Sequence, residues 1–399
     1  MVIPAIGNGV FISCFPLWVV PWIDEFHVSR STAMTGFAIG NLVMGLASPI
    51  VGNCLERFPA RMTVASGGIA LAAGFGLGSM AHAFWQIIAL YASVLALGAA
   101  FTGMLPAQSV AVRLLPHKAG TLSGVITLGI STGGIIMPVV LTGPVAALGW
   151  RPAFLITGAI VLVTIVPSAW FLLRDRGERG VAMHDAAGAP GNEAAPISTR
   201  AIFGMLAFWV PLMGVVPAMF VVGTVLTHAV AIAADSGIAI GVAGYLVPAI
   251  AAGGAVGSVG LGWLCDRMDY RWVFGTTAAA TVLALLVLLG HVGPLPMALA
   301  FAVVGVVAGG VFPVVGVMVV RSFGPLAFAR IMGMMMPPLI IAMAVAPVIA
   351  GWVRDRTGSY NADFAGCAGL MLFSGVAVFT FRPAPMKSGL TRADLARLA

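Results

Sequence analysis

The chain has 399 residues, of which 60% are hydrophobic and only 8% carry a charge. This composition excludes a water-soluble globular protein and predicts an integral membrane protein. The formal net charge is +7, from 20 Lys and Arg against 13 Asp and Glu. Because these basic residues are scattered and mostly flank apolar stretches, we interpret the charge as a topological signal and expect no nucleic-acid partner.

Twelve apolar stretches are long enough to cross the ~30 Å hydrocarbon core of a bilayer as helices. The sequence therefore predicts an all-α integral membrane protein with twelve transmembrane helices. Their approximate limits are 2–22, 32–52, 62–82, 85–112, 119–147, 152–173, 202–231, 239–264, 272–291, 295–320, 329–351 and 363–381.

Basic residues define the predicted orientation. If the carboxyl-terminal tail lies in the cytosol, 16 of the 20 Lys and Arg fall on the cytosolic side. The exceptions are Arg30, Arg151, Arg354 and Arg356. Positive residues concentrate on the cytosolic side of membrane proteins, so we expect a multi-pass protein of the cell inner membrane with both termini in the cytosol.

Residues 174–200 are rich in Ala, Gly, Pro and charge, which predicts a flexible cytosolic linker. We expect a six-helix bundle at 1–173, a second at 201–382 and a cytosolic tail at 383–399. The halves match at an offset of 210 residues, which indicates duplication, with a substrate site expected between them. The matches are Glu25 with Asp235, Gly52 with Gly262, Glu56-Arg57 with Asp266-Arg267, Arg61 with Arg271, and Phe154 with Phe364.

A short motif follows the second span of each half. The two copies resemble the G-x-x-x-D-R-x-G-x-R signature of the major facilitator superfamily, which implies a secondary transporter with two six-helix pseudo-repeats. In such a motif the glycine lets helices approach closely, and the charged groups pair with one another or with a neighbouring helix amino end. We therefore assign gating roles to Glu56, Arg57, Arg61, Asp266, Arg267 and Arg271.

Four further segments resemble the bacterial branch of the monocarboxylate porters and oxalate:formate antiporters. They are Glu25-Phe-His-Val-Ser29-Arg30-Ser31, Ala119-Gly120-Thr-Leu-Ser-Gly124, Gly149-Trp150-Arg151-Pro-Ala-Phe154, and the segment from His228 to Gly237. This resemblance implies a monocarboxylate or related organic acid as the substrate, with proton coupling as an option.

Ser258 departs from the pattern of that branch. The resemblance places an arginine at this position of the eighth span, where it would pair with the substrate carboxylate, and this chain has serine there. A neutral or amphiphilic solute, moved by uniport or export, is therefore an alternative substrate. Both interpretations stay open at the level of the sequence.

All Asp, Glu, Lys and Arg fall in predicted loops or helix ends, so we expect substrate selection by shape and neutral hydrogen bonds. For the Ser and Thr candidates, a bond to the carbonyl of the same helix is the alternative role. The candidate substrate-binding residues are Asn8, Phe11, Phe15, Gln108, Thr127, Ser131, Thr224, His228 and Ser258.

His228 is the one titratable side chain within a predicted span, and histidine can gain or lose a proton near neutral pH. We assign it to proton coupling, with a neutral structural histidine as the alternative. The four cysteines lack metal-site or redox spacing and predict free thiols. No catalytic motif is apparent, so we expect a non-enzyme without cofactor or metal. We further expect a monomer whose partners are membrane lipid and a small-molecule substrate, with a proton as an optional partner.

Overall fold

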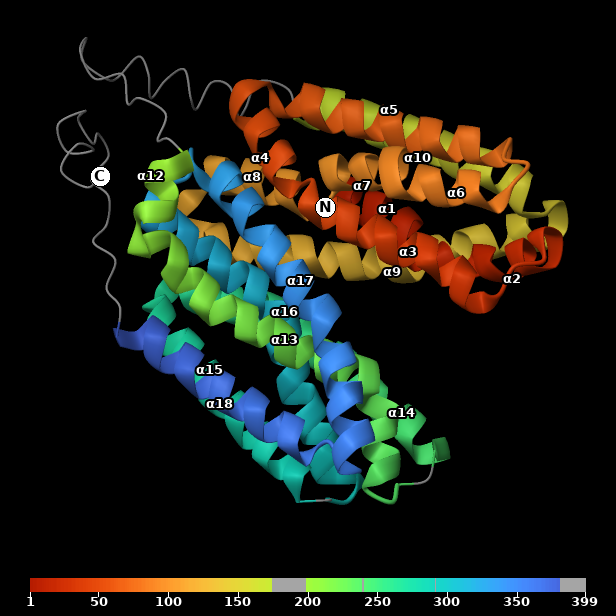
Figure 1. The fold of residues 1–399 in the computed structure, drawn as a ribbon. Helices are drawn as coiled ribbons and strands as arrows, with labels where there is room; N and C mark the ends of the chain where they lie inside the picture. Colours follow the sequence, from red (N-terminus) through yellow and green to blue (C-terminus); the bar gives the residue numbers. More distant parts are fainter. Residues whose placement is uncertain (174–198, 239, 291, 381–399) are drawn as a thin grey trace, which may run out of the picture. The chain divides into compact units, whose positions relative to one another are not determined.

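The computed structural model describes residues 1–173, 199–238, 240–290 and 292–380 (Figure 1). Twelve helical segments in this part of the chain are long and apolar enough to cross a membrane, which confirms the predicted number. All four cysteines are free thiols, also as predicted. The predicted tail at 383–399 and nearly all of the predicted linker lie outside the described residues.

The described chain packs into two compact units. Unit 1 contains Met1–Leu114, the described part of Ile126–Ala187, and Ala329–Pro337; unit 2 contains Leu115–Val125 and the described parts of Gly188–Phe328 and Pro338–Ala399. Each unit thus includes a short segment from the other half of the sequence.

The helices of unit 1 are α1 (Val2–Asn8), α2 (Phe15–Phe26), α3 (Arg30–Leu46), α4 (Ser48–Arg57), α5 (Ala60–Ser79), α6 (Phe84–Leu90), α7 (Ala96–Thr102), α8 (Met104–Leu114) and α10 (Trp150–Leu172). Those of unit 2 are α12 (Thr199–Gly204), α13 (Leu206–Asp235), α14 (Ile240–Arg267), α15 (Tyr270–Leu289), α16 (Pro294–Phe323) and α18 (Asn361–Thr380). Helices α9 (Ala119–Leu148) and α17 (Phe328–Thr357) contribute to both units.

The helices extend beyond the apolar stretches. Glu56 and Arg57 form the end of α4, and Asp266 and Arg267 form the end of α14, so both helices continue past the predicted limits at 52 and 264. Helix formation depends on backbone hydrogen bonds, which continue where charged side chains reach the membrane surface. The helix α4 stops where Phe58 adopts an extended backbone before Pro59.

Two π-helical segments interrupt spans that the sequence predicts as continuous. Gly9–Ser13 separates α1 from α2, and Tyr91–Leu95 separates α6 from α7. In the first, the Cys14 amide donates to the Gly9 carbonyl, five residues back, at 3.0 Å. Pro16, which has no N–H to donate, follows directly. Because π-helical segments occur often at functional sites, these two spans of unit 1 are candidates to contribute to one.

The core of unit 1 is an aromatic cluster. Trp18, Trp22, Tyr91 and Phe154 have no more than 1% of their surface exposed. Trp18 lies edge-on to Phe154 with ring centroids 4.8 Å apart, and Trp22 lies edge-on to Tyr91 at 6.0 Å. Edge-to-face aromatic pairs add roughly 0.5–1.5 kcal/mol to the gain from burial, so these rings hold the helices of unit 1 together.

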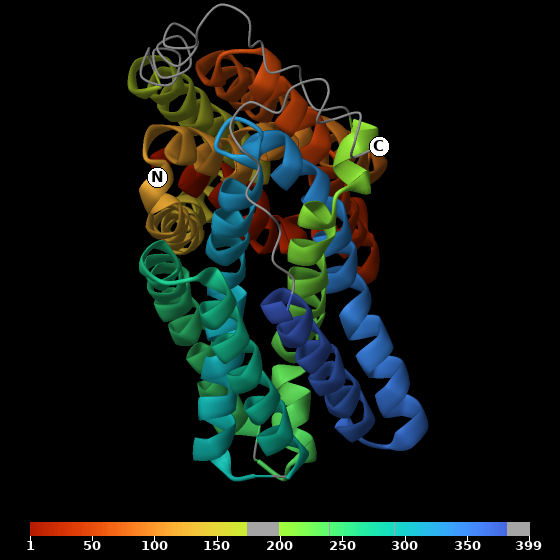
Figure 2. The ribbon, with the colours of Figure 1, turned by 90° about the vertical axis from the view of Figure 1, so that its left-hand side faces the viewer.

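Unit 2 depends instead on close backbone contact between α14 and α16. A Cβ atom added to Gly253 or Gly257 of α14 would overlap carbonyl oxygens of α16, and the same holds for Gly305 and Gly309 of α16 against α14. Small residues allow such contact between membrane helices, where dispersion forces replace the hydrophobic effect. Elsewhere in unit 2, α15 packs along α18 (Figures 1 and 2).

Gly257 and Gly260 of α14 provide a matched test of this packing. We expect Gly257→Ala to reduce the free energy of unfolding by about 1–3 kcal/mol, because the new methyl group overlaps the Val306 carbonyl oxygen. Gly260→Ala should cause no loss, because no atom lies within 4 Å of its added methyl group. Thermal unfolding of both variants in the same detergent measures the difference, and equal midpoints would contradict the packing argument.

Candidate functional site

The carboxylate of Asp266 binds the amino end of α9. It accepts hydrogen bonds from the Gly120 amide at 2.8 Å, the Thr121 amide at 2.7 Å and the Thr121 hydroxyl at 2.6 Å. Amides in the first turn of a helix have no partner within the helix, and the helix dipole favours a negative charge there. Asp266 therefore fixes residues 115–125 to the end of α14.

Glycines allow the two backbones to meet beside this carboxylate. A Cβ atom on Gly262 would overlap the Gly120 carbonyl oxygen, and one on Gly120 would overlap that of Gly262. One turn further along, a Cβ atom on Gly124 would overlap the carbonyl oxygen of Ser258. The glycine of the motif thus has the role that we predicted from the sequence, which is close helix approach.

The first copy of the motif repeats the arrangement with a weaker charged contact. A Cβ atom on Gly52 would lie 2.5 Å from the Ala329 carbonyl oxygen. Glu56 reaches the Arg330 guanidinium of α17 at 3.9 Å, a long ion pair in place of direct bonds to helix amides. Because 329–337 belong to unit 1, this contact lies within unit 1 as the Asp266 contact lies within unit 2.

The motif arginines lie against aromatic side chains. The Arg267 guanidinium is 4.1 Å from the centre of the Trp263 ring, and that of Arg61 is 5.6 Å from the Trp170 ring. Arg271 lies 5.8 Å from the Tyr270 ring and 3.7 Å from Asp269, while Arg57 is exposed. These positions suit cations anchored at a membrane surface, and gating roles for them stay a prediction.

Among the predicted substrate residues, Phe11 and Phe15 belong to the core of unit 1. Phe11 stacks on Tyr91 with centroids 5.5 Å apart, and Phe15 lies edge-on to the same ring at 5.1 Å. Both are no more than 1% exposed. Packing accounts for their positions, and substrate contact by these two rings stays a prediction.

Gln108 is the most informative of the predicted polar residues. Its side chain is 1% exposed, and its amide nitrogen has no hydrogen-bond partner among the described residues. It lies on α8, just after the break at Gly103 where Pro106 interrupts the fourth span. A buried unpaired donor is energetically costly, so this amide is available to a ligand that accepts a hydrogen bond.

Two further candidates of unit 1, Asn8 and Ser131, bond to their own helices, whereas a substrate contact by Thr127 on α9 stays a prediction. Asn8 donates to the Pro4 carbonyl at 3.3 Å, and its nitrogen would lie 3.4 Å from a Cβ atom on Gly103. Ser131 donates to the Thr127 carbonyl at 3.3 Å, which is the alternative role that we gave for hydroxyl groups. Asn8 and Gln108 therefore both adjoin the break in the fourth span.

In unit 2, Ser258 is 1% exposed and donates to the Ala255 carbonyl at 2.9 Å. Its carbonyl oxygen faces Gly124, so the position at which the resemblance places an arginine lies in a tight helix contact. Thr224 is fully buried and lies beside the Cys367 thiol. A substrate contact by either residue stays a prediction.

His228 joins three segments of unit 2. Its Nε2 lies 3.0 Å from the Pro347 carbonyl oxygen and its Nδ1 lies 3.0 Å from the Tyr360 hydroxyl. A carbonyl only accepts, so Nε2 carries the hydrogen of the neutral ring, and Nδ1 accepts from the phenol. Burial raises the pKa of the Tyr360 phenol, as does the charge of Asp235, so the phenol stays protonated and donates this bond.

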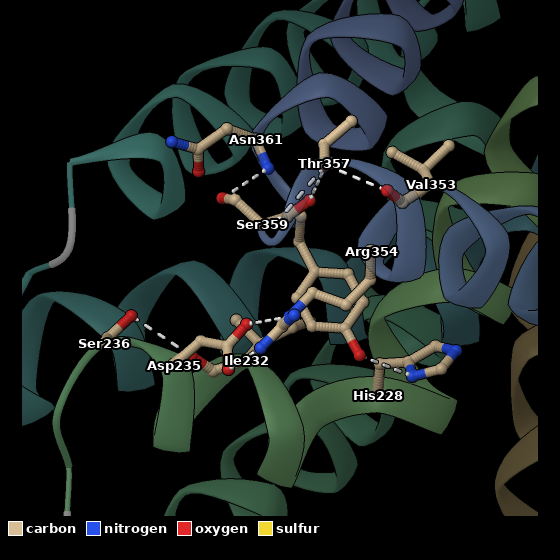
Figure 3. A network of polar contacts seen from close by, with 10 residues as sticks. His228, Ile232, Asp235, Ser236, Val353, Arg354, Thr357, Ser359 and Asn361 are labelled. Atoms are coloured by element: carbon tan, nitrogen blue, oxygen red, sulfur yellow. Dashed lines mark hydrogen bonds and ion pairs between the residues drawn. The ribbon is translucent and has the colours of Figure 1, made fainter.

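Two ion pairs explain two of the arginines that break the predicted charge asymmetry. Arg354 donates to Asp235 through Nε at 2.6 Å and through an amino nitrogen at 3.0 Å (Figure 3). Arg151 pairs with Glu25, which also accepts from the Trp150 indole at 2.5 Å. Glu25 and Asp235 are matched by the internal repeat, but their partners are not, because the offset of 210 places Asn361 opposite Arg151. The repeat could therefore have marked the two acids, whereas the choice of arginine depends on the packing of the helices.

Asp363 is the residue that sequence reasoning missed. It lies at the start of α18, where a helix-end acid is ordinarily solvated, yet it is only 6% exposed. Nothing in the local sequence marks this burial, which results from the packing of α13 against α18.

Breaking the Asp266 contact should expose the segment that it holds. Ser123 is fully buried, so a Ser123→Cys thiol, in a background where the native cysteines are replaced, should react slowly with a maleimide. Adding Asp266→Asn should increase the reaction rate, because the charged bonds to the α9 amides are lost. Glu56→Gln, which alters the longer ion pair, serves as the control and should have the smaller effect. Equal rates with and without Asp266→Asn would rule out this role.

Comparison with known proteins agrees with this geometry. The family model described as the Major Facilitator Superfamily matches residues 3–231 and 212–397. Monocarboxylate transporter 12 of Mus musculus is 23% identical over 91% of this chain and 80% of its own length. Monocarboxylate transporter 11 of Homo sapiens is 28% identical over 91% of this chain and 77% of its own.

Solved structures share the fold. The proton:xylose symporter XylE has a TM-score of 0.68 at 15% identity, with 99% of this chain and 97% of that chain covered. The human organic anion transporter MFSD10 has a TM-score of 0.60 at 16% identity, with 94% and 98% covered. The family match over nearly the whole sequence, together with twelve spanning helices, shows that the chain belongs to the Major Facilitator Superfamily of transporters.

Proposed function

We propose that this transporter moves a small organic acid, in particular a monocarboxylate, across the membrane by alternating access. The relatives named monocarboxylate transporters cover 91% of the chain, which supports this substrate class. The unpaired amide nitrogen of Gln108 is the observation that carries the proposal, since a carboxylate oxygen is a strong acceptor for such a donor.

The repeated helix contacts support alternating access. Asp266 binds the amides of α9 within unit 2, and Glu56 reaches Arg330 within unit 1. In the proposed cycle these contacts break and re-form, and because Asp266 makes the shorter bonds, its contact has more influence on the balance between states.

The same proposal includes the cellular setting. The excess of Lys and Arg at one set of predicted loops supports both termini in the cytosol and a location in the cell inner membrane. We further propose that the chain works as a monomer with two six-helix domains, 1–173 and 201–382.

A neutral or amphiphilic solute is the second candidate substrate. Ser258 takes the place where the resemblance puts an arginine, and its buried contact with Gly124 leaves little room for a longer side chain. Because residue 258 is a serine, this position provides no positive charge to pair with a substrate carboxylate.

Gln108 distinguishes the two substrate classes. Gln108→Glu keeps the size of the side chain and adds negative charge, so it should abolish binding of an anion, whereas a neutral solute should lose only the contribution of the hydrogen bond. Gln108→Leu removes the hydrogen bond and should weaken binding of either class by about tenfold. Thermal-shift titrations and proteoliposome uptake with lactate and with its neutral amide measure both effects.

Asn41→Asp is the matched control. The Asn41 amide is half-buried in the same unit and already donates to the Phe37 carbonyl at 2.9 Å, so its conversion to an acid should leave lactate binding unchanged. If Gln108→Glu binds lactate with wild-type affinity, the proposed role of Gln108 is contradicted. If the wild-type protein binds the neutral amide of lactate and does not bind lactate, the neutral solute is selected as the substrate class.

We also propose that transport is coupled to a proton through His228. An imposed proton gradient should then stimulate uptake by the wild type, while His228→Ala should lose the stimulation and keep substrate exchange. His228→Gln should behave like His228→Ala, because an amide cannot carry the proton. His82→Ala, at an exposed histidine, should behave like the wild type. Stimulated uptake by His228→Ala would leave His228 a structural role.

A further inference from the structure

A buried carboxyl group lies in unit 2 beside the His228 network. Asp363 is 6% exposed, and its nearest polar partner is the Cys367 thiol, with Sγ 3.8 Å from the carboxyl oxygen. Within the described residues it forms no ion pair, and Tyr360, which donates to His228, lies three residues before it, immediately before α18. A thiol is a weak donor, so it compensates little of the cost of a buried negative charge.

The internal repeat shows what packing alone requires at this place. At the offset of 210 residues, His228 corresponds to Trp18, Tyr360 to Trp150, and Asp363 to Ala153. In unit 1 all three positions are buried, two by the rings of Trp18 and Trp150 and one by the methyl group of Ala153. The two rings lie 4.8 and 5.4 Å from Phe154.

The corresponding rings of unit 2 have a similar arrangement. His228 lies 5.3 Å from Tyr360, and Tyr360 lies 6.2 Å from Phe364, the counterpart of Phe154. At these three positions unit 1 therefore has no titratable side chain, whereas unit 2 has three. Since an acid in a membrane protein interior is expensive compared with a methyl group, its presence indicates a use other than packing.

The hydrogen bonds determine where a proton can be added. Nε2 of His228 donates to the Pro347 carbonyl, so a second proton must enter at Nδ1, where the Tyr360 phenol now donates. The imidazolium that forms needs a negative partner, and an ionised Asp363 supplies one. Conversely, a neutral His228 is matched by a protonated Asp363 without net charge.

We propose that Asp363 and His228 together form a binding site for one exchangeable proton, with Tyr360 as the link to the surface. With the proton bound, the pair is neutral overall, either as carboxylic acid and imidazole or as carboxylate and imidazolium. Release of the proton to water leaves one negative charge. The part of this site in transport rests on the proton coupling proposed above, whereas proton binding itself does not.

The other charged groups around the pair are already compensated or solvated. Asp235 of α13 and Arg354 of α17 neutralise each other through two hydrogen bonds (Figure 3). Asp355 of α17 is exposed, and the Arg354 guanidinium lies 5.9 Å from the Tyr360 ring. Together with Tyr360 and Cys367, these are the titratable and charged groups that face the site.

Infrared difference spectra of the purified full-length protein test the site without transport. Raising the pH should remove the carbonyl stretch of a protonated buried carboxyl group in the wild type. The band should be absent from Asp363→Asn and present in Asp355→Asn, whose carboxyl group is exposed. Asp363→Ala, which places the alanine of position 153 at the matching position of unit 2, should also lack the band. This second variant controls for any effect of the asparagine amide introduced by Asp363→Asn.

Nuclear magnetic resonance of ¹⁵N-labelled histidine tests the sharing of the proton. If the groups are coupled, Asp363→Asn should shift the titration midpoint of His228 by about one pH unit or more and leave His82 unchanged. A wild-type band that survives in both Asp363 variants, or an unchanged His228 midpoint, would overturn the proposal.

Uptake measurements separate this inference from the proposed function. Loss of the band in the Asp363 variants, in a protein whose wild-type uptake ignores a proton gradient, would support the site and reject coupled transport. Gradient-driven uptake that is unchanged in Asp363→Asn would show that the coupled proton binds elsewhere. It would overturn the part of this site in transport, while the infrared and magnetic resonance results decide proton binding itself.

Discussion

A bilayer interior offers no hydrogen-bond partners, so every polar group within it must find one inside the protein. The structure meets this constraint mainly within single helices. The hydroxyl groups of Thr157, Ser258 and Thr281 all donate to carbonyls one turn back. The unpaired amide of Gln108 and the nearly unpartnered carboxyl of Asp363 are among the exceptions, together with the indole nitrogens of Trp18 and Trp22. The functional proposals concentrate on the amide and the carboxyl because these groups can bind a substrate or a proton.

The duplicated halves have diverged in a consistent direction. Both copies keep the glycine contact and the acid at the end of the second helix, at Gly52 with Glu56 and at Gly262 with Asp266. Tight glycine contacts occur in both units, for example between Gly133 and the Ala5 carbonyl in unit 1. The aromatic core, by contrast, belongs to unit 1, and the titratable network around His228 belongs to unit 2. The shared features are those that the fold and its conformational change require, and the differing features are available for substrate and proton binding.

Much of the fold could be predicted from the sequence. The number of helices, the duplication and the family follow from apolar length, the repeat offset and a spaced motif, which are all local or periodic signals. The helix ends, the π-helical segments at Gly9–Ser13 and Tyr91–Leu95, and the burial of Asp363 could not be predicted, because they depend on contacts between helices. The candidate site shows the same division. The role of Gly262 was predictable from the motif, whereas the amide partners of Asp266 belong to residues 145 or more positions away.

The contact between Gly120 and Gly262 has a consequence for the speed of conformational change. Neither residue has a side chain, so forming the contact freezes no rotamers, and separating it releases none. An interface of long side chains would need to reorder them each time it closed. In the transport cycle that we propose, a backbone contact of this kind opens and closes with a small entropic barrier, and the carboxylate of Asp266 provides the directional bonds that fix its register.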